Sequence, residues 1–280
     1  MSLRALVSGA VFLSILPLSG LAQQVPLPPR RCSLSAPGQC ARDIAQDQRG
    51  ILASPKQVRK KDLAWLAPLA LGTGVALGFD RSALSHVSTD ESRTKSFATA
   101  SNFTGMYLPI ATAGSAWILG QFRHDDHLRE TGTLAMLAFV DTQIFTTFLK
   151  FATDRVRPQA PGVGREAGEF WPDGKYSSSA TSFPSGHTAS AFAVAHVIAN
   201  EYPGWKVKLA VYGLAAATGF ERVEARKHFP SDVLIGGAVG YLIGGYVFDH
   251  HSMRSKAHLS VSPILARRGA GVSLQFFPGK

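Results

Sequence analysis

Three short stretches, far apart in the chain, hold most of the side chains that could perform chemistry. Together they supply three fixed cations, two histidines, a serine hydroxyl and a carboxylate. The residues are Lys150, Arg157 and Pro158 in the first stretch, Pro184, Ser185, Gly186 and His187 in the second, and Arg222, His228 and Asp232 in the third. Phosphoryl transfer through a histidine requires this set of groups.

The three cations suit the charge that develops when a phosphoryl group is transferred. That charge spreads over three equatorial oxygens, so catalysis consists largely of aiming positive charge and hydrogen-bond donors at them. Lys150 brings a compact point charge, whereas Arg157 and Arg222 bring planar forks that match two oxygens at once. Ser185 and the backbone N–H of Gly186 can add donors, and a glycine lets a ligand come close because it has no Cβ. The sequence therefore predicts that these five residues bind phosphate.

The two histidines and the aspartate can divide the bond-making and proton-transfer steps. We expect His228 to be the nucleophile, with Asp232 accepting a hydrogen bond from one ring nitrogen and leaving the other free to attack phosphorus. His187 would serve the leaving group, because an alcohol or phosphate that departs near neutral pH needs a proton. The predicted catalytic residues are thus His228, His187 and Asp232.

The order and spacing of the three stretches resemble the superfamily of type 2 phosphatidic acid phosphatases, class A acid phosphatases and vanadium haloperoxidases. The motifs of that family read Lys-x6-Arg-Pro, Pro-Ser-Gly-His and Ser-Arg-x5-His-x3-Asp. This chain matches them over Lys150–Pro158, Pro184–His187 and Arg222–Asp232. The recognisable region runs over roughly residues 63–250. One position departs, because Glu221 stands where the family usually has serine, and its negative charge is expected to lower phosphate affinity.

The resemblance implies metal-free hydrolysis through a phosphohistidine on His228, with His187 acting first as acid and then as base. No metal and no cofactor are expected, and vanadate is expected as an inhibitor or, in a haloperoxidase, as a cofactor. The leading prediction is a hydrolase for a phosphomonoester or diphosphate, with a phosphorylated lipid as the favoured substrate. The alternatives are a periplasmic acid phosphatase for small soluble esters, a vanadium haloperoxidase and a non-catalytic phosphate-binding protein.

Residues 1–22 have the pattern of an export signal. Arg4 precedes an apolar stretch from Ala5 to Leu18, and Gly20-Leu21-Ala22 offers small residues for cleavage. An uncleaved membrane anchor is the alternative, and either one would deliver the following chain outside the cytoplasm. We therefore expect the protein in the periplasm or at the periplasmic face of the inner membrane.

A basic, proline-rich segment over residues 23–62 follows the signal and carries much of the formal net charge of +10. It could contact anionic lipid headgroups or serve as a solvated tether, and we expect no nucleic-acid partner. Cys32 and Cys40, the only cysteines of the chain, lie within it. An oxidising compartment would favour a small disulfide loop, with two free thiols as the alternative.

The remaining chain predicts an all-α fold. Six apolar stretches follow Asp62, separated by polar or Gly/Pro connections and without a strand-like alternation. They lie near 63–79, 104–122, 133–149, 187–199, 207–220 and 233–248. We expect a six-helix bundle over residues 63–252, with all three motifs at the helix ends that meet at one end of the bundle.

Whether this bundle crosses a membrane is a separate question. A spanning helix needs about 20 apolar residues, most of the stretches are shorter, and the mean hydropathy of the chain is only +0.06. Asp141 and Gln143 also interrupt the third stretch. We expect an exported bundle that does not span as a six-helix set, although 233–248 could pass for a span and a membrane surface is an expected partner.

Two further segments lead to local expectations. Residues 253–280 form a tail in which apolar and polar residues alternate around Arg267-Arg268-Gly269, a pattern that favours a short hairpin. The connection from Gln159 to Ser182 joins the first two motifs, so its aromatic residues could border the substrate or form a lid. His124-Asp125-Asp126-His127 has metal-ligand types but no obvious third partner, and we expect no metal there.

Overall fold

The computed structural model describes residues 32, 37–159, 167–172, 180–253, 258–266 and 269–277. Residues Arg31–Ser252 form one compact unit, and the residues from Met253 onward belong to a second unit. The export signal predicted over 1–22 lies outside the described residues.

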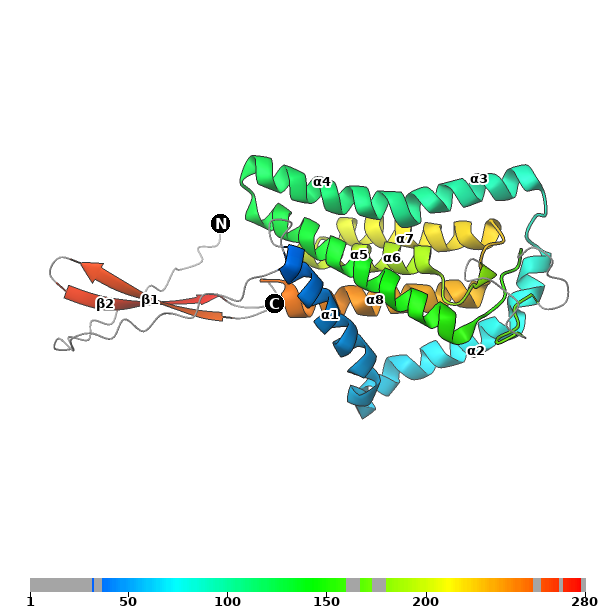
Figure 1. Cartoon of the computed structure of the whole chain (residues 1–280), viewed down its shortest axis with the longest axis horizontal. Helices are drawn as coiled ribbons and strands as arrows, with labels where there is room; N and C mark the ends of the chain where they lie inside the picture. Colours follow the sequence, from blue (N-terminus) through cyan, green and yellow to red (C-terminus); the bar gives the residue numbers. More distant parts are fainter. Residues whose placement is uncertain are drawn as a thin grey trace, which may run out of the picture. The chain divides into compact units, whose positions relative to one another are not determined.

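The first unit is helical (Figure 1). Its helices are α1 (Pro37–Ala53), α2 (Leu63–Ser85), α3 (Glu91–Asn102), α4 (Leu108–Arg123), α5 (Asp126–Thr153), α6 (Gly186–Glu201), α7 (Trp205–Glu224) and α8 (Pro230–His251). Short 3₁₀ turns occupy Ser54–Gln57 and Lys60–Asp62, and a π-helical turn, Phe103–Tyr107, precedes α4.

The predicted helix count of six is too low for the described part of the chain. The six apolar stretches lie in α2, α4 with its preceding π turn, α5, α6, α7 and α8, but α1 and α3 are additional. Both additional helices are polar on average and contain no long apolar run. A search for apolar stretches passes over such helices, because they are held by one buried face and by side-chain contacts with their neighbours.

Helix α6 packs against α5, α7 and α8, and α4 packs against α5 (Figure 1). Small residues allow the close contact between α6 and α8. A Cβ atom on Gly240 of α8 would overlap the carbonyl oxygen of Ala189 in α6, so only glycine fits there. This close packing fixes the N-terminal ends of α6 and α8 beside each other, and both ends carry predicted site residues.

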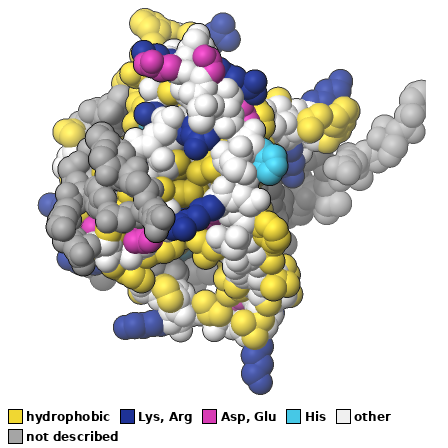
Figure 2. Space-filling model, turned by 90° about the vertical axis from the view of Figure 1, so that its right-hand side faces the viewer, with side chains coloured by type: hydrophobic (Ala, Val, Ile, Leu, Met, Phe, Trp, Pro, Cys, Tyr) yellow, Lys and Arg dark blue, Asp and Glu magenta, His cyan; other side chains and the backbone are white. Residues whose placement is uncertain are grey.

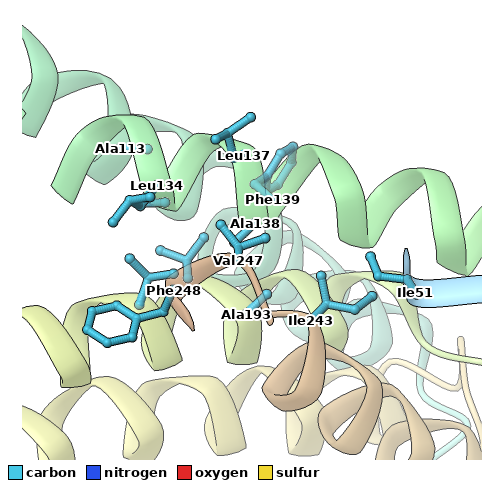
Figure 3. Close-up of a cluster of buried hydrophobic side chains, with 13 residues drawn as sticks. Ile51, Ala113, Leu134, Leu137, Ala138, Phe139, Ala193, Ile243, Val247 and Phe248 are labelled. Carbon is cyan, nitrogen blue, oxygen red and sulfur yellow. The ribbon is translucent and has the colours of Figure 1, made fainter. Parts of the chain in front are cut away.

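The apolar core lies away from the motif-bearing helix ends (Figure 3). It contains Ile51, Ala113, Leu134, Ala135, Leu137, Ala138, Phe139, Ala193, Val194, Val197, Ile243, Val247 and Phe248. These residues come from α1, the first half of α5, α4, α6 and the second half of α8. Complete burial of a Leu, Ile or Phe side chain stabilises a fold by roughly 1.5–3 kcal/mol, so this cluster is a major source of stability away from the motifs.

The described part of the basic segment is folded against this core. Cys32 and Cys40 form a disulfide, and the backbone N–H of Cys32 donates to the Asp43 carboxylate of α1. Farther along α1, Gln48 donates to the Asp141 side chain of α5 at 2.8 Å. Helix α1 is therefore part of the bundle and not a solvated tether.

Within the described residues, three helical segments are long and apolar enough to cross a membrane, by length and composition: Lys60–Ser85, Asp126–Thr153 and Pro230–His251. Half of the most apolar window is buried in the second and third, but none of it in the first. Large apolar side chains of α2 are exposed, including Leu71 (71 %) and Phe79 (64 %). An exposed apolar helix surface is typical of an interaction with a membrane or another protein.

The second unit contains strands β1 (His258–Ala266) and β2 (Gly269–Phe277), which pair antiparallel. Leu259 stands opposite Phe276, and Val261 stands opposite Leu274. The apolar residues of the alternating pattern therefore pair with one another across the two strands.

Candidate active site

The three motifs occupy helix ends that meet at one end of the bundle. Lys150 lies in the last turn of α5, Gly186 and His187 begin α6, and Arg222 lies in the last turn of α7. Asp232 lies in the first turn of α8, four residues after His228. Figure 2 views this end of the molecule and shows Lys and Arg side chains gathered around a hollow with apolar side chains at its floor.

His228 is the most enclosed of the predicted catalytic groups, with 1 % of its surface exposed. Its Nδ1 atom lies 3.5 Å from Oδ2 of Asp232, which is too long for a good hydrogen bond, and among the described residues it has no hydrogen-bond partner. Burial, together with the charges of Arg222, Lys150 and Arg157, holds the pKa of His228 well below its ordinary value. The imidazole is thus neutral before an anion binds, with a lone pair available for attack.

Asp232 is held from both sides. Its Oδ2 atom accepts a hydrogen bond from the backbone N–H of Phe229 at 2.8 Å, which fixes the start of α8. Its Oδ1 atom accepts from Arg155 at 2.5 Å. The side chain is fully buried, so its orientation relative to His228 is set by these partners.

The two arginines of the motifs are held by contacts that use only part of each guanidinium. Arg222 donates from one terminal nitrogen to Ser101 and Asn102, both at 3.2 Å, while its Nε has no partner among the described residues. Arg157 donates from Nε to the carbonyl oxygen of Thr181 at 2.8 Å. Burial and the charge of Arg157 lower the pKa of Arg222 to about 10. These like charges repel one another, and a bound anion would relieve the repulsion.

Helix α6 directs its N-terminus at the same place. The backbone N–H of Ser185 donates to the carbonyl oxygen of Asp232 at 3.0 Å. The Ser185 hydroxyl forms a hydrogen bond with the Thr188 hydroxyl at 2.9 Å. A Cβ on Gly186 would make only ordinary 3.6 Å contacts with Gln143 and Thr146, so packing alone does not require glycine there. The positive end of the helix dipole adds to the attraction for an anion.

His187 stands in the first turn of α6. Burial, and then the charges of Arg222, Lys150 and Arg157, lower its pKa to about 3. The π-helical turn packs against it, because a Cβ on Gly105 would lie 2.7 Å from the His187 Cβ. Before an anion binds, His187 is therefore neutral, and it needs a negative ligand nearby before it can hold a proton as an acid.

Glu221, which stands where serine is usual, forms a hydrogen bond with the π-helical turn. Its carboxylate accepts a hydrogen bond from the Thr104 hydroxyl at 2.7 Å. The neighbouring Arg222 donates to Ser101 and Asn102, so both side chains link α7 to the α3–α4 region. The sequence alone does not reveal this partner, and the expected effect of Glu221 on phosphate affinity stays a prediction.

The described parts of the 159–182 connection are fixed to the first motif. Val156 exchanges two backbone hydrogen bonds with this connection, donating to Glu169 and accepting from Gly168, both at 3.0 Å. Trp171 is 70 % exposed, and its indole N–H donates to the carbonyl oxygen of Ala152 at 2.7 Å. Tyr176 lies outside the described residues, so a lid role for the aromatic residues stays a prediction.

Sequence reasoning missed three residues that support the site: Asp80, Arg155 and Ser231. Arg155 donates to Asp232, to the Ser231 hydroxyl at 2.7 Å and to Asp80 at 2.6 Å. Its guanidinium also lies over the rings of Phe170 and Phe229. The available signal was a second arginine inside the first motif and an aspartate directly after the apolar stretch that ends at residue 79.

The His124–His127 cluster has local structural partners. Asp125 accepts from the Leu128 N–H and caps α5, Asp126 pairs with Arg129, and His127 contacts Glu201 at 2.7 Å. Within the described ranges, no group of three or more His, Cys, Asp or Glu side chains is arranged to hold a metal ion.

Comparison with known proteins adds an independent observation. Residues 131–256 match the family model of the PAP2 superfamily. A segment of 81 residues, 28 % of this chain, is 46 % identical to the lipid A 1-phosphatase of Porphyromonas gingivalis. The chain spans only 17 % of the length of that relative.

Two solved structures show weaker similarity. The crystal structure of Aquifex aeolicus LpxE is 22 % identical, with 62 % of this chain and 94 % of that chain covered and a TM-score of 0.43. A transmembrane PAP2-type phosphatidylglycerolphosphate phosphatase from Bacillus subtilis is 20 % identical, with 80 % and 100 % covered and a TM-score of 0.44. At TM-scores this low, neither similarity supports a conclusion about this chain. The region matched by the PAP2 superfamily model, residues 131–256, contains all three motifs, from Lys150 to Asp232.

Proposed function

We propose that the protein is a phosphatase that removes a phosphate group from a phosphorylated lipid at a membrane surface, through a phosphohistidine on His228. The observation that carries the proposal is a buried, neutral histidine within the field of three cations at the end of a helical bundle. Cations in excess, enclosed around a nucleophile, favour a substrate that brings negative charge. The match of residues 131–256 to the PAP2 superfamily model supports the same reaction.

The first chemical step forms a bond between phosphorus and His228 and breaks the ester bond. The Nδ1 atom faces Asp232, so the attacking atom is Nε2. Positive charge develops on the imidazole as it attacks, and Asp232 stabilises it by accepting the Nδ1 proton in a hydrogen bond that shortens from the 3.5 Å contact. Lys150, Arg157 and Arg222 neutralise the phosphoryl oxygens in the transition state.

The second role belongs to His187. A bound phosphate dianion offsets the cations that depress the pKa of this histidine, so the ring takes up a proton when the substrate binds. It gives that proton to the departing oxygen of the lipid alcohol or phosphate. In the next step a water molecule attacks the phosphohistidine, His187 accepts a proton from that water, and inorganic phosphate leaves. None of these steps is assigned to a metal ion.

The lipid part of the proposal rests on the surface of α2 and on the relative. The most apolar window of α2 is unburied, and the helix meets the length and composition of a membrane span. The relative from Porphyromonas gingivalis acts, by its name, on the 1-phosphate of a lipid. A protein whose apolar helix lies in a membrane would hold its active site close to lipid headgroups.

The test is phosphate release by the purified protein from three substrates offered side by side in detergent micelles. These are a phosphoglycolipid that carries a 1-phosphate, phosphatidic acid and a soluble aryl phosphate. We expect kcat/KM for at least one lipid to exceed that for the soluble ester by about 100-fold, a difference of roughly 2.7 kcal/mol in transition-state binding.

Two controls accompany this assay. Excess EDTA should leave the rate unchanged, whereas loss that added Mg²⁺ or Zn²⁺ restores would contradict a mechanism without metal. A preference for the soluble ester would overturn the lipid assignment while keeping the reaction. Absence of turnover on every substrate, with a folded protein, would overturn the phosphatase assignment itself.

A further inference from the structure

We propose that Asp80 and Arg155 are positioning residues for the phosphatase reaction, and that helix α2 thereby takes part in orienting the nucleophile. The inference rests on the proposed function and extends it to two residues outside the three motifs. Neither residue is argued to touch the substrate. Both act through Asp232, which faces His228.

Arg155 joins two carboxylates from different helices. One terminal nitrogen of its guanidinium donates to Asp232 Oδ1 of α8 at 2.5 Å, and the other donates to Asp80 Oδ2 of α2 at 2.6 Å. The side chains of the three residues are at most 3 % exposed. A planar fork that uses two separate nitrogens for two carboxylates fixes the angle between them, which a lysine cannot do.

Asp80 also fixes the start of α8 directly. It accepts hydrogen bonds from the backbone N–H of Ser231 at 3.0 Å and from the Ser231 hydroxyl at 2.5 Å. Ser231 is adjacent to Asp232 in the chain, and its hydroxyl also accepts from Arg155. Asp80 therefore holds Asp232 in two ways. It fixes Arg155, which binds the Asp232 side chain, and it fixes the backbone of the preceding residue, Ser231.

The division of the Asp232 oxygens explains why this matters for catalysis. Arg155 occupies Oδ1, while Oδ2 accepts from the Phe229 N–H and faces His228 Nδ1. If Arg155 were free to rotate or to take both oxygens, the oxygen that stabilises the imidazolium would be displaced or neutralised. Asp80 supplies the second negative charge that holds the guanidinium in its present orientation.

A purely structural role is the competing explanation. The apolar window of α2 is unburied, so the polar cluster could serve only to attach α2 to the bundle. A buried ion pair is weak support for a stabilising role by itself, because desolvation can cancel the attraction between the charges. The two explanations differ in what they predict for turnover by a folded variant.

The experiment compares Asp80→Asn and Arg155→Lys with the matched control Asp47→Asn. Asp47 is also a buried aspartate with a cationic partner, since it contacts His251 Nε2 at 2.8 Å, but it lies on α1 and touches none of the predicted site residues in the described structure. Each variant is assayed as the full chain for kcat, KM and midpoint of thermal unfolding, with the preferred substrate.

We expect Asp80→Asn and Arg155→Lys each to lower kcat by about 10- to 100-fold, the same size as the effect of removing a group that orients a metal ligand, with KM changed by less than about threefold. Asp47→Asn should keep kcat within about twofold even if its unfolding midpoint falls. Arg155→Lys is the sharper variant, because it retains the positive charge and loses only the fork.

Wild-type kcat in a folded Asp80→Asn or Arg155→Lys protein would overturn the inference. Losses of kcat in all three variants that follow the decrease in their unfolding midpoints would also overturn the inference, in favour of the structural role. Both results leave the proposed function intact if the wild-type protein turns over and forms a phosphohistidine. Failure of the wild type to form one would instead remove the proposed function.

Discussion

Two clusters of buried charge in the described part of this bundle differ in the sign of their excess. At the catalytic end, Arg155 bridges Asp80 and Asp232 beside the cations of the motifs. At the α1 face, Asp47 pairs with His251 and Asp141 accepts from Gln48. The described residues thus place surplus cations around a histidine in one cluster and surplus carboxylates around a histidine in the other. Buried charge alone therefore does not indicate an anion-binding site. A buried cluster in which cations outnumber carboxylates does indicate one.

The largest expected effect comes from replacing the histidine of the catalytic cluster, with the histidine of the α1 cluster replaced as a control. His228→Ala should lower kcat by about 10⁴-fold and abolish acid-labile phosphoenzyme, because it removes the nucleophile itself. His251→Ala should keep kcat within about twofold, since its partner is Asp47. Rapid alkaline quench with substrate radiolabelled in its phosphate measures the phosphoenzyme, and steady-state phosphate release measures kcat. Phosphoenzyme in His228→Ala would show that another residue carries the phosphoryl group.

A smaller effect is expected from the second catalytic histidine. His187→Ala should lower kcat by about 10²- to 10³-fold for an ester with a poor leaving group, because the departing oxygen then lacks a proton donor. With an aryl ester that has a good leaving group, the rate of phosphoenzyme formation should fall much less, while breakdown of the phosphoenzyme stays slow. Pre-steady-state bursts of aryl alcohol separate the two steps. Equal losses for both leaving groups would mean that His187 has no acid role.

The sequence predicts the helical parts of the fold and the motif-bearing ends well, because both depend on local patterns. Apolar stretches mark the helices that bury wide faces, and the spacing from Arg222 to Asp232 brings its residues to one turn between two helices. Helix α1 is missed because one narrow face and partners far along the chain, such as Asp141, hold it. Asp80 is missed for the same reason: its partners, Arg155 and Ser231, are 75 and 151 residues away in the chain.

The smallest expected effect concerns Glu221, where the chain departs from the family pattern. Its carboxylate accepts from Thr104 next to the contacts that hold Arg222, so the glutamate both adds a negative charge near the cations and ties α7 to the π-helical turn. Glu221→Ser removes the charge and introduces a hydroxyl, and it should tighten vanadate binding by about two- to fivefold, because the positive excess is then less compensated. Glu221→Gln is the matched control, since it removes the charge and retains the length needed to reach Thr104.

Competition by vanadate against the preferred substrate measures both variants. Similar tightening in Glu221→Ser and Glu221→Gln would assign the effect to charge and sharpen the contrast with the carboxylate-rich cluster at α1. Weaker binding in Glu221→Ser alone would show that the link to Thr104 matters more than the charge. In that case Glu221 positions Arg222 through the π-helical turn. The site then retains its affinity for an anion despite the negative charge of Glu221, because the hydroxyl of Thr104 holds the carboxylate in place.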